Sequence, residues 1–257
     1  MNEFLIGLQF LTRIYIARQT KWTEESFGKS VKYFPLIGAV VGIISAVLAG
    51  FFFFITGGKL PTFTGALAFV LPIILTGAIH CDGFMDSVDG LFSGREREKI
   101  LEIMKDSRVG AFGAVSLVLI SALEISALVE LFKLSINFTL ASIFAAPIIS
   151  RLMMVVTIGI FPYARPQGMG KAFAMYTTRE TIFFAAVSTL LLLLPLILFD
   201  VKIFLTAVLA LTISFGFTLY FGKFATKKIG GVTGDIYGAV STLVELIVPI
   251  IFLFSLI

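Results

Sequence analysis

The sequence predicts an all-α fold, a polytopic membrane helical bundle with about seven transmembrane helices and additional interfacial amphipathic helices. Hydrophobic residues make up 58% of the 257-residue chain, charged residues make up only 14%, and the mean hydropathy is +1.02. The apolar residues form long unbroken runs, which favours helices over a β-barrel because each helix satisfies its own backbone hydrogen bonds in lipid. No internal repeat or long linker divides the chain, so we expect a single integral membrane domain over residues 1–257.

Seven apolar runs are the candidate spans, and most of them approach the roughly 20 residues that a helix needs to cross the hydrocarbon layer. They lie at residues 34–56, 63–79, 111–132, 136–160, 181–199, 203–222 and 236–257, and the second is the shortest. Before them, residues 1–33 form an interfacial amino-terminal segment in which Phe4, Leu5, Leu8 and Leu11 recur at helical spacing. Glycine and proline pairs mark the joints between spans.

The basic residues lie almost entirely in alternate loops, and this asymmetry orients the expected bundle. Lys and Arg in short loops stay preferentially on the cytoplasmic side of a membrane. Sixteen fall on one side, at Arg13, Arg18, Lys21, Lys29, Lys32, Arg95, Arg97, Lys99, Lys105, Arg108, Arg165, Lys171, Arg179, Lys223, Lys227 and Lys228. The opposite loops carry three, at Lys59, Lys133 and Lys202, while Arg151 lies inside a span. We therefore expect the aspartate-rich motif described below and the loops at 161–180 and 223–235 to face the cytoplasm.

Composition argues against two other kinds of partner or cofactor. A pI near 9.2 is compatible with nucleic-acid binding, but the basic residues follow the membrane topology instead of forming a continuous stripe, so we expect no nucleic-acid partner. The single cysteine, Cys81, has no second thiol for an internal disulfide, and together with the single histidine it falls short of a zinc ligand set. The partner that composition does predict is the lipid bilayer.

Three carboxylates interrupt the apolar background within residues 80–94. Asp82, Asp86 and Asp89 are spaced by four and then three residues, which places all three side chains on one face if the segment is helical. Like charges at such short range repel unless protons or a cation neutralise them. Mg²⁺ prefers carboxylate oxygens and bridges to substrate phosphates, so the sequence predicts a magnesium site formed by these aspartates. The alternative is a solvated charged loop or a set of helix caps.

The segment after the aspartates predicts an amphipathic helix on the membrane surface. Ser93 and Glu96 match a capping box, and Ile100 and Met104 lie on one side of the helix that would follow. Cations and small residues then precede the next span, where an arginine suits phosphate oxygens through its bidentate geometry. Residues 80–110 are thus expected to form a cytoplasmic motif with its own helix.

Four segments, taken in chain order, also carry a family resemblance. The run from His80 to Gly113 contains His-x-Asp-Gly-x-x-Asp-x-x-Asp-Gly and then Leu-Glu-Ile-Met-Lys-Asp-Ser-Arg-x-Gly. The other three are Phe10-Leu11-Thr12-Arg13, Phe34-Pro35-Leu36-Ile37-Gly38 and Gly230-Gly231-Val232-Thr233-Gly234-Asp235. Together they resemble the signature, amino-terminal motif, first-span entry and closing glycine loop of the cobalamin synthase family, the adenosylcobinamide-GDP ribazoletransferases.

The resemblance implies a transferase that completes the nucleotide loop of cobalamin. In this reaction α-ribazole or its 5′-phosphate attacks adenosylcobinamide-GDP, GMP leaves, and adenosylcobalamin or its 5′-phosphate forms. It also implies Mg²⁺ as the cofactor and a place in the prokaryotic cytoplasmic (inner) membrane, with the active site facing the cytoplasm. Asp82, Asp86 and Asp89 would hold one or two ions, and His80 or one of these aspartates would take the hydroxyl proton. The sequence leaves a homo-oligomer open.

Glycines and charged residues near this motif are candidate substrate-binding groups, and each has a structural alternative. Gly83 and Gly90 would let a bulky diphosphate approach, or they would serve ordinary helix packing. Asp106 and Arg108 would bind substrate, or they would form a local surface ion pair. For His80, the alternative to catalysis is a plain hydrogen bond at the interface or in the core.

Two later loops add cations and backbone N–H groups to the candidates. The loop that contains Arg165 and Lys171 is rich in glycine and suits a phosphate or nucleotide, while its alternative is a positive topological anchor. In the loop that ends at Asp235, the N–H groups around Gly231 would cradle an anion, with Thr233 and Asp235 touching phosphate or metal.

Charged residues inside the spans are costly unless they pair or face a wet cavity. Arg151 and Glu245 each lie ten residues from the cytoplasmic end of a span, which corresponds to a depth of roughly 15 Å. They are therefore expected to form an ion pair that either locks two helices or lines the floor of a substrate cavity, with Glu124 as a third candidate. The chain departs from the family pattern at Thr242, where some members carry a second glutamate.

Two other classes of protein are weighed against this function. A CDP-alcohol phosphotransferase also uses membrane aspartates with Mg²⁺, but its pattern has Ala-Arg after the first Asp-Gly pair, where this chain has Met85-Asp86. A transporter would place its binding site near the midplane of the bilayer, whereas the acids here concentrate at the cytoplasmic edge. Release of GMP distinguishes the proposed enzyme from a transporter.

Overall fold

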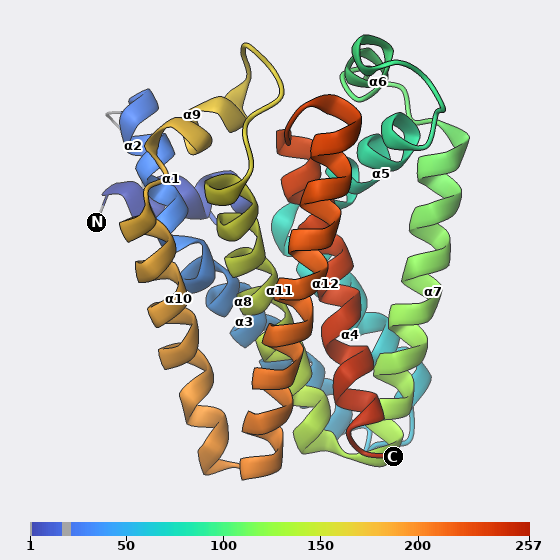
Figure 1. Ribbon diagram of the computed structural model, residues 1–257. Coiled ribbons are helices and arrows are strands. Elements are labelled where there is room, and N and C mark those ends of the chain that lie inside the picture. The colour runs from blue at the N-terminus through green and yellow to red at the C-terminus, as the bar shows by residue number, and fades with distance from the viewer. Residues whose placement is uncertain (1, 17–21) are drawn as a thin grey trace.

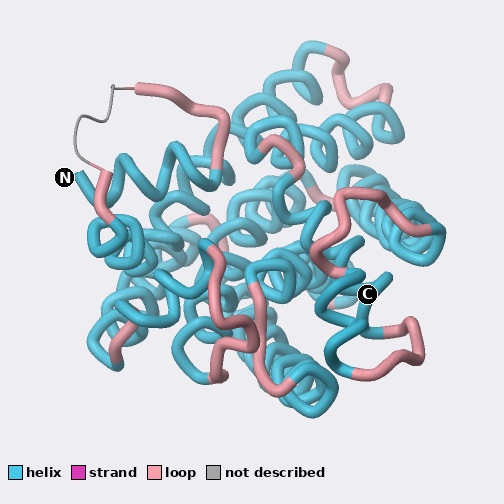
Figure 2. Tube along the Cα trace, turned by 90° about the horizontal axis from the view of Figure 1, so that it is seen from above, coloured by secondary structure: helices cyan, strands magenta, loops and turns pink. Residues whose placement is uncertain are grey.

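The computed structural model describes residues 2–16 and 22–257, and this part of the chain is built from helices without a β-strand. Two views of the molecule show helices throughout, joined by loops (Figures 1 and 2). The only pairing of extended residues among them is a single parallel bridge between Tyr163 and Val232. The all-α expectation is therefore confirmed.

The amino-terminal segment packs onto the bundle as a series of short helices before the first long one. Its elements are α1 (Asn2–Leu11), α2 (Glu24–Gly28), a 3₁₀ turn (Lys29–Tyr33) and α3 (Phe34–Ile55). The apolar side of α1 buries Ile6, Leu8 and Leu11 in the main core, so this helix rests on protein as well as at a surface. Thr23 and Ser26 form a reciprocal capping box that starts α2.

The second apolar run does not continue as a straight span. It forms α4 (Pro61–Thr76), which bends by 92° into α5 (Ile79–Leu91), the helix that carries the aspartates. Gly77 and Ala78 make the bend with φ angles of 64° and 62°, a left-handed conformation that glycine adopts freely and alanine rarely does. As a result, α5 crosses obliquely beneath α6 instead of running along the bundle (Figure 1).

The amphipathic helix after the aspartates exists but is short, and the predicted capping box is wrong. Helix α6 (Arg97–Ile103) buries Ile100, and Met104 just beyond its end is buried too. Glu96 is the residue that precedes the helix, and no side chain caps it. Ser93 instead donates to the carbonyl of Gly90, because the chain turns there before α6 begins.

The remaining helices complete the bundle around α8. They are α7 (Ala111–Leu134), α8 (Ile136–Ile160), α9 (Met169–Tyr176), α10 (Arg179–Leu193) with a 3₁₀ extension (Leu194–Leu198), α11 (Val201–Ile229) and α12 (Gly234–Phe254). In α8, 83% of the most apolar stretch is buried inside the protein, so this helix is the centre of the bundle. The end of the bundle that carries α1, α2, α6 and α9, here called the basic end, lies at the top of Figure 1.

Six helical stretches in the described chain are long and apolar enough to cross a membrane, or seven if the bent pair α4–α5 counts as one. The expected seven spans thus correspond to six straight ones and one broken one. Because of this break, α5 lies across the basic end of the bundle and carries its acidic residues there. Of the basic residues used to orient the bundle, Arg18 and Lys21 lie outside the described residues.

Candidate active site

Helix α5 presents a crowded acidic face at the basic end of the bundle. Asp82 is exposed and Asp86 is half-buried one helical turn further on, so the expected helical register of the aspartates is confirmed. Burial, and then the negative charges of Asp82, Asp235 and Asp89, raise the pKa of Asp86 to about 7, while Arg165 opposes the shift. Burial of Asp86 and the neighbouring carboxylates thus both disfavour its charged form, as expected where carboxylates share one helix face.

Asp89 is engaged differently from the other two aspartates. Its two carboxylate oxygens accept hydrogen bonds from the backbone N–H groups of Gly110, at 2.8 Å, and Gly113, at 2.9 Å. These N–H groups belong to the start of α7, where a carboxylate is favoured by the free amides and the helix dipole. The structure therefore gives Asp89 the role of a helix cap, one of the alternatives that the sequence left open.

Within residues 2–16 and 22–257, no group of three or more His, Cys, Asp or Glu side chains is arranged to hold a metal ion by itself. The three aspartates thus do not form a closed metal cage. Asp82 and Asp86 remain as two carboxylates on one face, which is the number that Mg²⁺ commonly takes from protein when substrate phosphates complete its shell.

Across from this acidic face, the start of α12 supplies a third carboxylate that is already paired. Asp235 Oδ2 lies 2.8 Å from Arg165 Nη2 and also accepts a hydrogen bond from the hydroxyl of Thr233 at 3.1 Å. Thr233 is the residue before α12 and accepts from the N–H of Ile236 as its cap. Arg165 Nε is buried and has no hydrogen-bond partner in the described chain, so the guanidinium keeps a free donor.

The two loops that carry these residues are tied to each other. The N–H of Val232 donates to the carbonyl of Pro162, and the N–H of Ala164 donates to the carbonyl of Val232, both at 2.8 Å. At Gly231 a Cβ atom would lie 2.3 Å from the Pro162 carbonyl oxygen, so only glycine allows this approach. Arg97 of α6 bonds to the carbonyls of Ile229 and Ala164 and holds both loops from outside.

Asp82 of the acidic face and the paired loops line a hollow of about 210 Å³ that has both polar and apolar walls. We call it the first hollow, and its polar lining residues are His80, Asp82, Tyr163, Arg165, Asp235 and Tyr237. Burial raises the pKa of Tyr163, which keeps its phenol protonated as a hydrogen-bond donor. Lys171 is exposed, and its ammonium donates to the carbonyl of Pro166 at 2.7 Å, so this cation sits at the loop surface outside the lining.

Two glycines expected near substrate serve helix packing in the structure. A Cβ atom at Gly83 would lie 2.9 Å from the backbone oxygen of Asp235, so this glycine sets the crossing of α5 and α12. A Cβ atom at Gly90 would lie 2.3 Å from Met104 Cγ, at the contact of α5 with the segment after α6. These contacts show the packing role, while close approach of substrate stays a prediction, and Gly83 also lines the hollow described above.

Below the first hollow lies a buried group of ionisable residues. Arg151 Nη1 pairs with Glu245 and also bonds to the hydroxyls of Ser150, at 2.8 Å, and Ser241, at 3.2 Å. The expected ion pair between the two spans is thus confirmed. His80 and Glu124 are buried beside Glu245 around a small cavity, and His80 Nε2 has no hydrogen-bond partner among the described residues.

Asp106 and Arg108 form an exposed pair that is not part of the lining of the first hollow. Arg108 Nη2 lies 2.7 Å from Asp106 Oδ2, and the arginine side chain is 88% exposed. Hydrogen bonds from Arg108 lower the pKa of Asp106 to about 2. The local surface ion pair that the sequence left open is therefore the arrangement that the structure shows.

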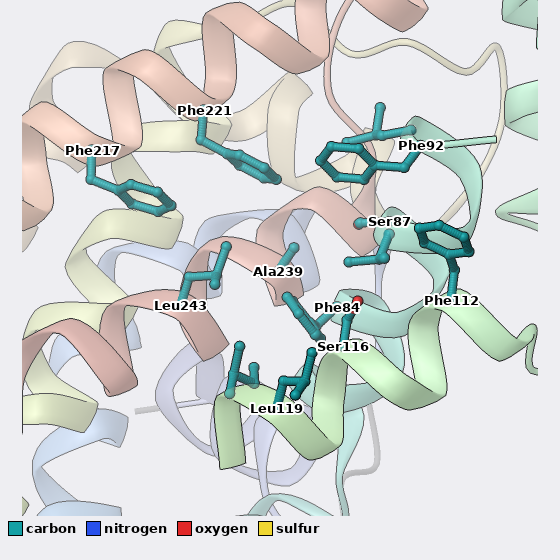
Figure 3. Close-up of a pocket in the computed structure, with 13 residues that line it drawn as sticks. Phe84, Ser87, Phe92, Phe112, Ser116, Leu119, Phe217, Phe221, Ala239 and Leu243 are labelled. Carbon is teal, nitrogen blue, oxygen red and sulfur yellow. The ribbon is translucent and has the colours of Figure 1, made fainter. Parts of the chain in front are cut away.

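A larger cavity of about 450 Å³ lies on the opposite side of α5 and is lined almost entirely by apolar groups. Figure 3 shows Phe217 and Phe221 of α11 on one side and Phe92 and Phe112 on the other, with Phe84 below. Phe84 and the aspartates project from opposite faces of α5 at 100° per residue. This cavity holds no titratable side chain and does not reach the acidic face.

Several site residues escaped the sequence analysis because their signal was weak. Tyr163 and Tyr237 look like ordinary aromatic residues in a membrane protein, and only the fold turns them towards the first hollow. Arg97 looked like part of a topological charge cluster, yet it clamps two loops that are distant in sequence. Arg13 was identified only within the Phe10-Leu11-Thr12-Arg13 motif and as an orienting charge, and it lines a second cavity together with Asp82.

Comparison with known proteins gives a consistent result over nearly the whole chain. A family model described as cobalamin-5-phosphate synthase matches residues 3–253. A relative from Fusobacterium nucleatum, described as adenosylcobinamide-GDP ribazoletransferase, is 38% identical over 98% of this chain and 97% of its own length. Relatives of the same description from Desulfitobacterium hafniense and Thermoanaerobacter pseudethanolicus are 38% and 35% identical, over 96% and 98% of this chain and 94% and 97% of their own lengths. No solved structure matches the chain significantly.

Proposed function

The chain belongs to the cobalamin-5-phosphate synthase family and is an enzyme of cobalamin biosynthesis, and from this premise we propose its substrates and mechanism. The donor is adenosylcobinamide-GDP, and the acceptor is α-ribazole or its 5′-phosphate. The enzyme transfers the adenosylcobinamide phosphate group to a hydroxyl of the acceptor and releases GMP. The observation that carries this proposal is the acidic face of α5 opposite the Arg165–Asp235 pair, at one end of an apolar bundle.

The first hollow suits the diphosphate of the donor. Arg165 is held by Asp235 and still has a buried Nε donor without a partner, which is the condition for binding an anion with little reorganisation. Tyr163 adds a protonated phenol on the same wall. These groups would fix the phosphoryl oxygens, and the guanosine would lie towards the loop that precedes α9.

Magnesium fits the donors on α5, and we propose Asp82 and Asp86 as its protein ligands. Bound there, Mg²⁺ supplies charge neutralisation for the phosphoryl oxygens and the departing GMP. Two carboxylates lie one turn apart here, and burial together with neighbouring negative charge raises the pKa of Asp86, so the site gains from a divalent cation. Asp89 would not be a ligand of the ion. It would support the site by holding the start of α7 against α5.

His80 is our candidate for the group that takes the proton of the acceptor hydroxyl. It lines the first hollow with Asp82, and its Nε2 atom is buried without a hydrogen-bond partner in the described chain. A neutral imidazole with a free ring nitrogen is able to accept one proton. Arg151 and Glu245 lie further below and would support the floor of this site.

We propose the prokaryotic inner membrane as the location, with the first hollow facing the cytoplasm. The proposal rests on the basic end, because helices α1, α2, α6 and α9 lie at that end of the bundle with α5 (Figure 1) and Lys and Arg residues are concentrated in the loops expected to face the cytoplasm. On this basis Lys227 and Lys228 are topological anchors, since both are exposed in the last turn of α11. Family membership leaves the CDP-alcohol phosphotransferase and the transporter without support.

Replacement of both anchors, Lys227→Gln with Lys228→Gln, is expected to change the rate of GMP release by less than about twofold, because exposed charges outside a site contribute little. The rate is measured on purified protein, and orientation is measured by protease access to a carboxy-terminal tag. A large loss of rate with unchanged orientation would instead place these lysines in the active site.

The test of the proposed function is release of GMP by purified protein reconstituted in lipid. With adenosylcobinamide-GDP and Mg²⁺, and with α-ribazole and its 5′-phosphate tested in turn as the acceptor, we expect GMP and the cobalamin product in equal amounts with at least one acceptor. A chelator should stop the reaction, and added Mg²⁺ should restore it, which tests substrate and cation together. Absence of GMP release under these conditions would rule out the proposed function, and release that survives chelation would rule out the metal.

A further inference from the structure

We propose that a second hollow beside Asp82 is the site of the acceptor, and that Arg13 binds a phosphate group carried by the acceptor. This inference rests on the proposed function and extends it to Arg13 and the second hollow, to which the proposed function assigns no role. The second hollow has a volume of about 360 Å³. Its lining includes Gln9, Thr12, Arg13, Gly77, Asp82 and Met85.

The two hollows meet at Asp82, which lines both. On α5, Met85 lies on the flank of Asp82 that faces the second hollow, and Gly83 lies on the flank that faces the first. In-line displacement at phosphorus requires the attacking and leaving oxygens to lie on opposite sides of the reacting atom. A phosphorus atom held at Asp82 would therefore receive an acceptor from one hollow and release GMP into the other.

The step balances without any further reactant. The hydroxyl oxygen of the acceptor forms a bond to the phosphorus that carries cobinamide. The bond from this phosphorus to the bridging oxygen of the diphosphate breaks, GMP leaves with that oxygen, and the hydroxyl proton is released. This geometry assigns the donor diphosphate to Arg165 and the acceptor to the side of Arg13.

Arg13 is held in place while its charge stays available. Its backbone N–H donates to the carbonyl of Leu75 at 2.7 Å, which fixes the chain after α1 against the end of α4. Its guanidinium packs over Gly77, where a Cβ atom would lie 2.0 Å from Arg13 Nε. The residue is exposed and forms no ion pair with any carboxylate in the described part of the chain.

The two hydroxyls that line this hollow, those of Thr12 and Thr76, already bond to the backbone, and Thr76 Oγ1 donates to the carbonyl of Pro72 at 2.8 Å. Thr12 Oγ1 donates to the carbonyl of Leu8 at 2.6 Å and accepts from the N–H of Ile14 at 3.1 Å. Arg13 is therefore the cation that can recognise an anionic group here, and the planar guanidinium matches phosphate oxygens. The family description names a 5-phosphate product, which requires an acceptor that already carries a phosphate group.

The experiment compares two acceptors in the reconstituted enzyme, α-ribazole 5′-phosphate and α-ribazole, at saturating adenosylcobinamide-GDP. Arg13→Gln is expected to raise KM for the phosphorylated acceptor by about tenfold or more, with less than about a threefold change for α-ribazole and for the donor. Arg13→Lys should recover part of the loss, because it keeps the charge. Arg179→Gln is the matched control, since Arg179 is exposed at the start of α10 and lines neither hollow.

A second variant, Gln9→Glu, keeps Arg13 and adds a negative charge to the same hollow. This variant should also raise KM for the phosphorylated acceptor more than KM for α-ribazole. It tests the same assignment if the Arg13→Gln protein does not fold. Equal effects on both acceptors, or an effect mainly on the donor, would overturn the assignment of Arg13. If the wild-type enzyme released no GMP with either acceptor, the proposed function would fail first and this inference with it.

Discussion

Asp82→Asn and Asp86→Asn should each reduce the rate of GMP release by at least about 100-fold, the scale of losing a group that stabilises transition-state charge. Asn keeps the size of Asp but removes the negative charge that attracts a cation. Burial and then the neighbouring carboxylates raise the pKa of Asp86, so the site is expected to depend on a bound cation to balance these charges. Loss of one ligand would leave the phosphoryl oxygens of the donor without compensation.

These two substitutions should lower the rate of GMP release without changing how the protein folds or inserts into the membrane. Both aspartates are at least partly exposed and have no hydrogen bond or ion pair that holds the described fold together, so membrane insertion and thermal stability should stay near wild type. Glu98→Gln is the matched control, because Glu98 is an exposed acid of α6 at the same end of the bundle. Near-normal GMP release in either aspartate variant, measured over a Mg²⁺ titration, would refute the metal assignment for that residue.

Much of the fold was predictable because the lipid environment allows few solutions. Long apolar runs must become helices, and a buried arginine must find a partner, so both the bundle and the Arg151–Glu245 pair follow from the sequence. The bend between α4 and α5 was not predictable in the same way. It depends on two left-handed residues, and alanine at position 78 carries no signal for such a conformation.

The candidate site was predictable in its acidic core and not in its walls. The aspartate spacing identified one face of α5, yet it could not show that Asp89 points at the amides of Gly110 and Gly113. The partner of Arg165 is Asp235 at the start of α12, 70 residues away in sequence. Glycine spacing was equally ambiguous, since close helix packing and close substrate approach both require a missing side chain.

Glu245→Gln should lower the free energy of unfolding by about 3–5 kcal/mol, which is the typical result of removing one partner of a buried ion pair. The Arg151 side chain is 1% exposed and the Glu245 side chain is 15% exposed. Glutamine keeps an oxygen that can accept a hydrogen bond, but it and the hydroxyls of Ser150 and Ser241 are neutral, so the charge of the guanidinium would lose its compensation. A charge left in this position is far more costly than the same charge in water.

Thermal unfolding in lipid nanodiscs measures this effect, and Glu130→Gln is the matched control. Glu130 also pairs with a cation, Lys133, but their side chains are 51% and 47% exposed, so its loss should leave the melting temperature almost unchanged. A double variant, Arg151→Met with Glu245→Gln, should recover part of the stability because it removes the unpaired charge as well. If Glu245→Gln were as stable as the control variant, the Arg151–Glu245 pair would contribute nothing to holding α8 against α12, and the floor of the first hollow would need another support.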